Sequence, residues 1–274
     1  MSLLKDTKRL LEKHGIKPDR RLGQNFVVDR GVLEREVAYA ALKQSDTVLE
    51  IGPGVGTLTE LLVEHAGKVY AVEMDVRMIE ILKVRLKDRA EIIEGDFLKV
   101  ELPEFDKTIS NIPYSISSPL TFRLLSHGFK TAILTYQKEF ADRMVAKPGA
   151  RDYSRLSVTT YYRADAEILE VLPPEVFYPK PKVESAIVKL TPKKRPFEVN
   201  EELFFNLLRG LFSHRKKTLK KALLFSLSDA FGIKDKDKRR EITGSLEKGL
   251  VERRVFTLSP EEFAKICDTL EGRL

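Results

Sequence analysis

Polar residues that could do chemistry follow four runs of apolar residues. The first group is a loop with glycine at every second position, Gly52, Gly54 and Gly56. Glu73 ends the second apolar run, Asp96 follows the third, and Asn111 ends the fourth. Glycines allow sharp turns and a close approach of the backbone to a ligand. No Lys-Ser or Lys-Thr pair follows the loop, which excludes a triphosphate-binding loop.

The two acids suit a cofactor that contains adenosine. Glu73 can accept hydrogen bonds from both ribose hydroxyls, and Asp96 can accept one from an adenine amino group. On the sequence alone, Glu73 as a helix-capping acid and Asp96 as a turn residue remain alternatives. The G-x-G-x-G spacing with Glu50 just before it resembles the first motif of S-adenosylmethionine-dependent methyltransferases. The two acids do not distinguish such a cofactor from a nicotinamide one.

The stretch Asn-Ile-Pro-Tyr at 111–114 does distinguish the two cofactor classes. The exocyclic amine of adenine is a poor nucleophile because its lone pair is delocalised into the ring. Two acceptors, the side-chain oxygen of Asn111 and the carbonyl of Ile112, can bind its N–H groups and make the nitrogen more tetrahedral. Pro113 fixes the backbone there, and Tyr114 can stack on the base. The stretch therefore predicts methyl transfer to an adenine amine; the alternative is a strand-end turn with a core tyrosine.

The elements that must position these residues alternate between strand and helix. Strands are expected at 47–51, 68–73, 90–94, 107–110, 131–136, 166–172 and 185–190. Helices are expected between them and near the N-terminus, at 2–13, 31–42, 58–65, 74–89, 119–126 and 139–146. This alternation predicts an α/β fold, a seven-stranded Rossmann-like sheet with mostly parallel strands covered on both faces. The last two strands are joined only by a proline-rich loop, which favours antiparallel pairing.

The chain is expected to form two domains, a methyltransferase domain at 1–192 and a helical RNA-binding domain at 193–274. The boundary is the linker Thr-Pro-Lys-Lys-Arg-Pro at 191–196. Beyond it no strand pattern persists, and helices are expected near 200–212, 215–231, 238–248 and 259–270. The last has a strong start signal, a capping serine followed by proline and two acids.

Positive charge is concentrated in the second domain. The chain has net charge +7, and the part from Lys193 onward holds 19 Lys and Arg against 13 Asp and Glu. Such an imbalance suggests a polyanionic partner, although a solvated surface is the alternative. The proposed RNA-contacting residues lie on one expected helix: Arg215, Lys216, Lys217, Lys220 and Lys221. Stacking of Lys216 on Lys220 and of Lys217 on Lys221 would be repulsive without an anion.

Several longer motifs resemble those of the ribosomal RNA adenine dimethyltransferase family, and its small-subunit branch most closely. In chain order they are R-L-G-Q-N-F, L-E-I-G-P-G-x-G-x-L-T, E-G-D-F, N-I-P-Y-S-I-S-S-P-L, Q-K-E-x-x-x-R, S-R-L-S-V and F-Y-P-K-P-K-V-E-S. Ile112, where bacterial members usually have Leu, makes the chain resemble an archaeal member. The resemblance implies transfer of methyl groups from S-adenosylmethionine to N6 of two adjacent adenosines near the 3′ end of small-subunit RNA.

The resemblance also implies site residues. The cofactor would be bound by Gln24, Asn25, Val27, Gly52, Gly54, Glu73, Asp96 and Asn111. The target base would be held by Asn111, Pro113, Tyr114 and Phe177, the last closing on its other face. The implied partner is small-subunit ribosomal RNA or a pre-assembled small subunit.

Three other functions share some of these features. A large-subunit RNA methyltransferase of the macrolide-resistance type would use the same catalytic motif. A ribosome-assembly or transcription factor could use the fold without turnover. A DNA adenine methyltransferase usually has an acid where Asn111 stands. One cysteine and four histidines argue against a metal centre, and the absence of a long apolar run and of a signal peptide argues for a cytoplasmic protein without a membrane. We expect a monomer.

Overall fold

The computed structural model describes residues 2–19 and 22–274. These residues divide into two compact units, which we call unit 1 (residues 1–141 and 164–192) and unit 2 (residues 142–163 and 193–274). No helix in the described part of the chain combines the length and the apolar character needed to cross a bilayer.

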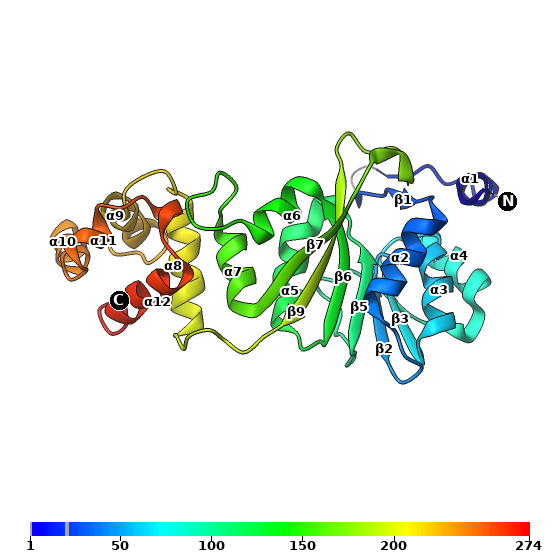
Figure 1. The fold of residues 1–274 in the computed structure, drawn as a ribbon, viewed down its shortest axis with the longest axis horizontal. Coiled ribbons are helices and arrows are strands. Elements are labelled where there is room, and N and C mark those ends of the chain that lie inside the picture. Colours follow the sequence, from blue (N-terminus) through cyan, green and yellow to red (C-terminus); the bar gives the residue numbers. More distant parts are fainter. Residues whose placement is uncertain (1, 20–21) are drawn as a thin grey trace. The chain divides into compact units, whose positions relative to one another are not determined.

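Unit 1 is built on a seven-stranded sheet with the order β4-β3-β2-β5-β6-β9-β7 (Figure 1). The strands are β2 (Thr47–Ile51), β3 (Lys68–Glu73), β4 (Glu91–Glu94), β5 (Lys107–Asn111), β6 (Thr131–Gln137), β7 (Ala164–Leu172) and β9 (Ser185–Pro192). Strands β2 to β6 are parallel, whereas β9 pairs antiparallel with both β6 and β7. The predicted fold class, the seven strands and the antiparallel final pair are thus confirmed.

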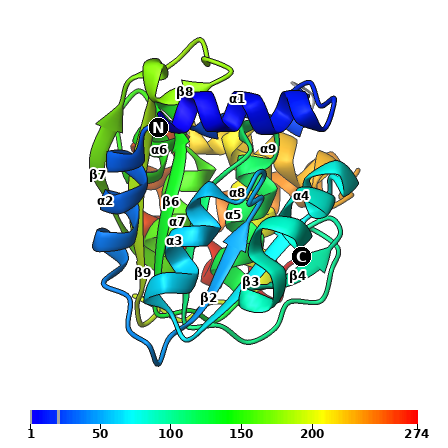
Figure 2. The same ribbon diagram turned by 90° about the vertical axis from the view of Figure 1, so that its right-hand side faces the viewer.

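Helices cover both faces of this sheet (Figure 2). Helices α2 (Arg30–Ala40), α3 (Thr57–His65) and α4 (Val76–Leu86) lie on the face toward the viewer, and α5 (Ser117–Ser126) lies on the other. Apolar side chains of α2 and α3 pack on β2, β5 and β6 in one buried cluster that includes Leu33, Leu62 and Ile109. Burial on both faces explains why the central strands β2, β5 and β6 are buried along most of their length.

A second, two-stranded sheet was not expected from the sequence. Strand β1 (Phe26–Val27) pairs antiparallel with β8 (Phe177–Tyr178), with Phe26 opposite Tyr178 and Val27 opposite Phe177. Helix α1 (Leu3–Lys13) lies at the same end, where Leu11 shares a buried cluster with Phe26. Two segments that are far apart in the chain thus lie side by side.

Unit 2 is helical, as predicted for the C-terminal part of the chain. It contains α7 (Arg155–Arg163), α8 (Glu201–Phe212), α9 (Leu219–Asp229), α10 (Lys236–Gly244), α11 (Lys248–Val251) and α12 (Pro260–Leu270), while α6 (Lys138–Val145) begins in unit 1 and ends in unit 2. The start of α12 is the predicted one, since Ser259 and Glu262 form a complete capping box.

The predicted domain boundary needs one correction. The junction after Pro192 coincides with the expected linker, but residues 142–163, which were expected in the first domain, belong to unit 2. The reason is burial: Tyr153, Val158 and Tyr162 share one apolar core with Phe204 and other residues of α8 to α12. The sequence pattern of 156–162 is apolar but does not say which core it joins.

The predicted helix at 215–231 also begins later than expected. Thr218 is extended and forms a bridge to Arg254, and helix α9 begins only at Leu219. The backbone around Lys217 is bound instead by the segment 253–256. The amide of Leu219 donates to the carbonyl of Arg253 at 2.7 Å, and the amide of Val255 donates to the carbonyl of Lys217 at 3.1 Å. Lys216 and Lys217 therefore precede the helix, and the predicted i,i+4 stacking on Lys220 and Lys221 is wrong.

Candidate functional site

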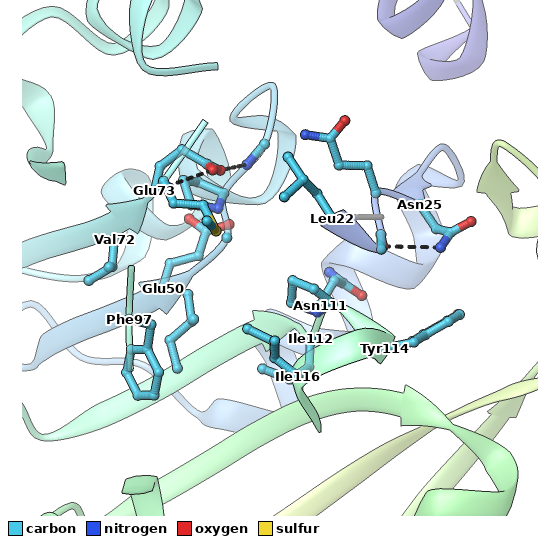
Figure 3. Close-up of a pocket in the computed structure, with 18 of the residues that line it drawn as sticks. Leu22, Asn25, Glu50, Val72, Glu73, Phe97, Asn111, Ile112, Tyr114 and Ile116 are labelled. Carbon is cyan, nitrogen blue, oxygen red and sulfur yellow. Dashed lines mark hydrogen bonds between the residues drawn. The ribbon is translucent and has the colours of Figure 1, made fainter. Parts of the chain in front are cut away.

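A pocket of about 220 Å³ lies in unit 1 where strands β2, β3, β4 and β5 end. It is the edge at which ligands of open α/β sheets bind. Every residue that the sequence predicted for the cofactor or the target base lines it: Gln24, Asn25, Val27, Gly52, Gly54, Glu73, Asp96, Asn111, Pro113, Tyr114 and Phe177. In Figure 3, Glu73 and Glu50 lie at one end, Tyr114 at the other, and Asn111 between them.

The glycine loop and Glu73 form one end of the pocket. The backbone is left-handed at Gly52 and Gly54, with φ of 69° and 56°. A side chain on Gly54 would also meet Phe26, since its Cβ would lie 2.7 Å from the ring. Glu73 is buried and accepts from the amides of Gly54, Met74 and Asp75 at 3.1, 2.8 and 2.9 Å. Burial raises the pKa of Glu73 in spite of these three hydrogen bonds.

Asp96 and Phe97 form the wall beside β4. One oxygen of Asp96 caps the following turn by accepting from the amide of Leu98 at 2.9 Å. Phe97 is buried, and the guanidinium of Arg123 lies over its ring and donates to its carbonyl. Asp96 is therefore a turn residue and a pocket residue at once, so the two roles considered from the sequence do not exclude each other.

The segment 22–27 forms the opposite wall, and the first residue of its motif, Arg21, lies outside the described residues. The side chain of Asn25 donates to the carbonyl of Gly23 at 3.1 Å (Figure 3). Gln24 is bound on both ends of its amide, because its nitrogen donates to Asp75 at 2.8 Å and its oxygen accepts from the amide of Asp19. Gln24 thus ties this wall to the start of α4, a structural role that the sequence did not indicate.

Asn111 has the geometry of a hydrogen-bond acceptor for a ligand. Its Nδ2 donates to Oε2 of Glu36 at 3.1 Å. Its Oδ1 is buried and has no hydrogen-bond partner among the described residues. A buried acceptor without a partner is unfavourable, so its presence in a pocket indicates a ligand donor.

Aromatic and rigid residues surround Asn111. Pro113, with φ of −58° and ψ of 122°, packs 3.5 Å from the position of a Cβ on Gly52. The hydroxyl of Tyr114 lies 2.6 Å from that of Ser185, which fixes one end of the ring. Phe177 is buried and is held by the pairing of β8 with β1. Both rings line the pocket that contains Asn111.

Two buried acids near the pocket were not predicted as functional residues. Glu36 and Glu50 are 1% and 2% exposed, and burial raises their pKa values to about 7 and about 8. Glu50 lines the pocket. Glu36 does not line it, but its carboxylate accepts a hydrogen bond from the pocket residue Asn111. A signal for Glu36 existed, since it lies on the same helical stripe as the apolar residues Val32 and Ala40.

The basic residues of unit 2 differ in exposure. Lys216, Lys217, Lys220 and Lys221 are all exposed. Arg215 instead donates to the carbonyl of Arg151 at 2.7 Å and lies over the ring of Phe256. Among the described residues, no group of three or more His, Cys, Asp or Glu is arranged to hold a metal ion.

Sequence comparison gives relatives along almost the whole chain. A family model described as ribosomal RNA adenine dimethylase matches residues 16–247. "Probable ribosomal RNA small subunit methyltransferase A" of Thermococcus gammatolerans is 49% identical over 260 residues, which cover 94% of this chain and 91% of that one. The protein of the same name from Methanothermobacter thermautotrophicus is 45% identical over 272 residues, 98% of this chain and 97% of the other.

Structural comparison agrees with these relatives. A dimethyladenosine transferase from Plasmodium falciparum superimposes with a TM-score of 0.78 at 35% identity, covering 89% of this chain and 97% of that one. The 23S rRNA methyltransferase ErmE superimposes with a TM-score of 0.63 at 27% identity, covering 90% and 99%. The shared sheet, the glycine loop and the asparagine at the end of β5 now have one explanation: the chain belongs to the ribosomal RNA adenine dimethylase family.

Proposed function

We propose that this protein transfers methyl groups from S-adenosylmethionine to N6 of two adjacent adenosines near the 3′ end of small-subunit ribosomal RNA. The observation that carries the proposal is Oδ1 of Asn111, a buried acceptor without a partner among the described residues, in a pocket beside Glu73 and the glycine loop. An adenine amine supplies the donor that this oxygen lacks.

The pocket suits S-adenosylmethionine at the end formed by Glu73 and Asp96. Glu73 has a carboxylate fixed by three backbone amides, which leaves lone pairs for ribose hydroxyls. Gly52 and Gly54 line this end of the pocket, and Phe97 and Val72 supply apolar walls for a flat base. When bound, the cofactor supplies an electrophilic methyl group. Gln24, Asn25 and Val27 would complete the wall of this site.

The other residues of the site act on the target base. Asn111 accepts one N–H of the amine, and the carbonyl of Ile112, held by Pro113, accepts the other, which makes the lone pair available for attack. Tyr114 and Phe177 hold the ring of the base from its two faces. No tuned general base is needed, because the methylated amine loses its proton readily to water.

Similarity favours the small subunit over the large one. The relatives named for the small subunit are 45 to 49% identical to this chain, whereas ErmE, a 23S rRNA methyltransferase, is 27% identical. We further propose that the partner is the RNA of a pre-assembled small subunit, that unit 2 binds RNA through Lys216, Lys217, Lys220 and Lys221, and that the protein acts as a cytoplasmic monomer. Because the guanidinium of Arg215 already binds a backbone carbonyl, we give it a smaller part in RNA binding.

Mass spectrometry of ribosomal RNA tests the proposed function. The protein is incubated with unmethylated small subunits and, in a separate reaction, with large subunits, each with cofactor carrying an isotope-labelled methyl group. We expect labelled N6,N6-dimethyladenosine in two adjacent positions of the small-subunit RNA and none in large-subunit RNA. Label in the large subunit only would favour the macrolide-resistance type of reaction.

Asn111→Ala is the matched inactive variant for this experiment. Its turnover should fall roughly 100-fold or more, the scale seen when one preorganised polar contact is removed from a reacting centre. RNA binding should change little, since the contact concerns one amine. A single-turnover rate near that of the wild type would refute the role of Asn111.

A further inference from the structure

The amide of Asn111 must present its oxygen, not its nitrogen, to the target amine. The two ends of an amide are nearly equal in size, so hydrogen bonds to the neighbours decide which end points where. In the reversed orientation, Nδ2 would face the target nitrogen as a donor and could not draw its hydrogens away. Some other residue must therefore hold the nitrogen end.

The neighbour that selects the orientation is Glu36 on α2. Its Oε2 accepts from Nδ2 of Asn111 at 3.1 Å, and its Oε1 accepts from the hydroxyl of Thr135 at 2.6 Å. Thr135 is the direct partner of Asn111 across the β5–β6 ladder, and its carbonyl accepts from the amide of Ile112 at 3.0 Å. An ionised carboxylate is an acceptor only, so it can bind the nitrogen end of the amide and not the oxygen end.

We propose that Glu36 is a positioning residue whose carboxylate holds the nitrogen end of the Asn111 amide and so leaves Oδ1 for the target amine. This inference rests on the proposed function, because it explains how Asn111 comes to accept from the amine. It assigns a role to a residue that does not touch the substrate and that lies 75 residues from Asn111 in the chain.

The burial of Glu36 supports a functional role over a merely structural one. The residue is 1% exposed, on a helix face that otherwise packs Val32, Leu33 and Val37 into the apolar core. A buried carboxylate is costly, and an apolar residue of similar size at such a position is often as stable or more stable. Perturbed acids of this kind concentrate at functional sites.

The ionisable groups around Glu36 belong to five elements, which are α2, α3, β2, β5 and β7. Arg35 on α2 lowers the pKa of Glu36, and Glu170 on β7, which pairs with Arg35 at 2.6 Å, raises it. Glu50 on β2 is the second buried acid and interacts with Glu36 through like charge. The elements packed on α2 also carry further ionisable residues, which are Lys107 on β5 and Glu60, Glu64 and His65 on α3.

The proposal predicts a dependence of turnover on pH. Burial is the main cause that raises the pKa of Glu36, to about 7. Above this pH the carboxylate is ionised and accepts from Nδ2. As the pH falls through about 7, the group gains an O–H that can donate to Oδ1, and the amide is free to turn. Turnover should therefore decrease as the pH falls through about 7 and then level off at the lower rate of a protein whose Asn111 amide is not oriented.

Three variants test the proposal in steady-state methylation of small-subunit RNA between pH 6 and 8.5. Glu36→Gln, like the protonated acid, offers the amide both a donor and an acceptor, so we expect its turnover at every pH to stay near the level that the wild type reaches well below pH 7. Glu36→Leu cannot orient the amide, and its turnover should be roughly tenfold lower at every pH with the KM values for both substrates within about threefold. Glu34→Gln, the same change at an exposed position of α2, should behave as the wild type.

A spectroscopic experiment separates failure of this inference from failure of the proposed function. The side-chain amide of Asn111 is followed by NMR in protein labelled with ¹⁵N-asparagine, and Asn111→Ala identifies the signal by its loss. We expect a shift with a midpoint near pH 7 in the wild type and none in Glu36→Gln, whether or not the RNA is a substrate. If Glu36→Gln keeps both the wild-type pH profile and the amide shift, Glu36 does not orient Asn111.

Discussion

At the scale of single residues, the site depends on side chains whose polar groups are already fixed before a ligand arrives. Glu73 is held by three backbone amides and Asn111 by Glu36. Such preorganisation reduces the rearrangement needed when charge develops during the reaction. The hydrogen bonds that hold these side chains are therefore already formed in the protein without a ligand.

Glu73 allows a direct test of cofactor binding. Losing a hydrogen bond to a charged group typically costs about 1.5–3 kcal/mol, so Glu73→Ala should bind S-adenosylmethionine roughly tenfold or more weakly by calorimetry. Circular dichroism should show an intact fold. Glu94→Ala is the control, because Glu94 ends the neighbouring strand β4 but is exposed and pairs with Lys83. Equal affinities of wild type and Glu73→Ala would move the ribose site elsewhere.

At the scale of elements, the pocket exists because the glycine loop and the β1–β8 pair fit closely together. Gly54 lies under the ring of Phe26, and Phe26 is aligned with Tyr178 of β8. The left-handed backbone of Gly54 and its lack of a side chain are both needed for this fit. The loop is thus part of the packing of β1 as well as part of the binding site.

Gly54→Ala should therefore disturb the pocket beyond the effect of backbone strain. Gly15 is the matched control, since its φ of 63° resembles that of Gly54 but no atom lies within 4 Å of an added Cβ. Alanine at a left-handed position costs about 1–3 kcal/mol, so thermal unfolding should show lower stability for both variants. Calorimetry should show cofactor affinity reduced roughly tenfold or more for Gly54→Ala only. Equal affinities for the two variants would contradict the packing role.

The sequence predicted the elements of unit 1 well because their signals are local. Apolar runs, glycine turns and strand-end acids specify the seven strands and bring the predicted residues to one edge.

Pairing of β1 with β8 was missed, because two-residue strands carry no periodic signal. The role of Glu36 was missed because an acid within Glu-Arg-Glu looks like a solvated helix face. The helix at 215–231 began too early in the prediction, because the competing backbone partner, segment 253–256, is distant in sequence.

At the scale of the whole molecule, charge is divided between the two units. The part from Lys193 onward carries most of the net positive charge, and four exposed lysines lie between Lys216 and Lys221. Although they do not stack on one helix as predicted, their exposure leaves them available to phosphates. Phosphate contacts position a nucleic acid without reading its sequence, so this cluster should contribute affinity rather than specificity.

Replacing Lys216, Lys217, Lys220 and Lys221 with Gln should reduce the salt dependence of RNA binding. Each contacted single-strand phosphate adds about 0.7 to the slope of log affinity against log salt, so the slope should flatten by roughly 1–3 units. Cofactor binding should be unchanged. The control replaces four lysines of unit 1 that pair with carboxylates, Lys68, Lys83, Lys99 and Lys130. Equal slopes for wild type and the unit 2 variant would show that these lysines do not contact the RNA backbone.

The discontinuous unit 2 predicts that the chain cannot be divided at residue 192. A fragment of residues 1–192 would keep 142–163 but lose its partners, exposing Tyr153 and Tyr162, which are 1% and 0% exposed in the whole chain. Each buried aromatic contributes about 150–250 Å² of apolar surface. The fragment should bind a hydrophobic dye and aggregate in size-exclusion chromatography. A monodisperse fragment that binds no dye would contradict this assignment.

The same crossing of the chain between units has a consequence for biosynthesis. Translation proceeds from the N-terminus at about 5–20 residues per second, so α7 is synthesised seconds before α8 to α12 are complete. Unit 1 is also incomplete during this time, because β9, its last strand, inserts between β6 and β7. Unit 1 cannot close before β9 is complete at Pro192, and unit 2 cannot close before α12 is made, up to Leu270. Until α12 is made, the apolar face of α7 is exposed rather than part of a folded core.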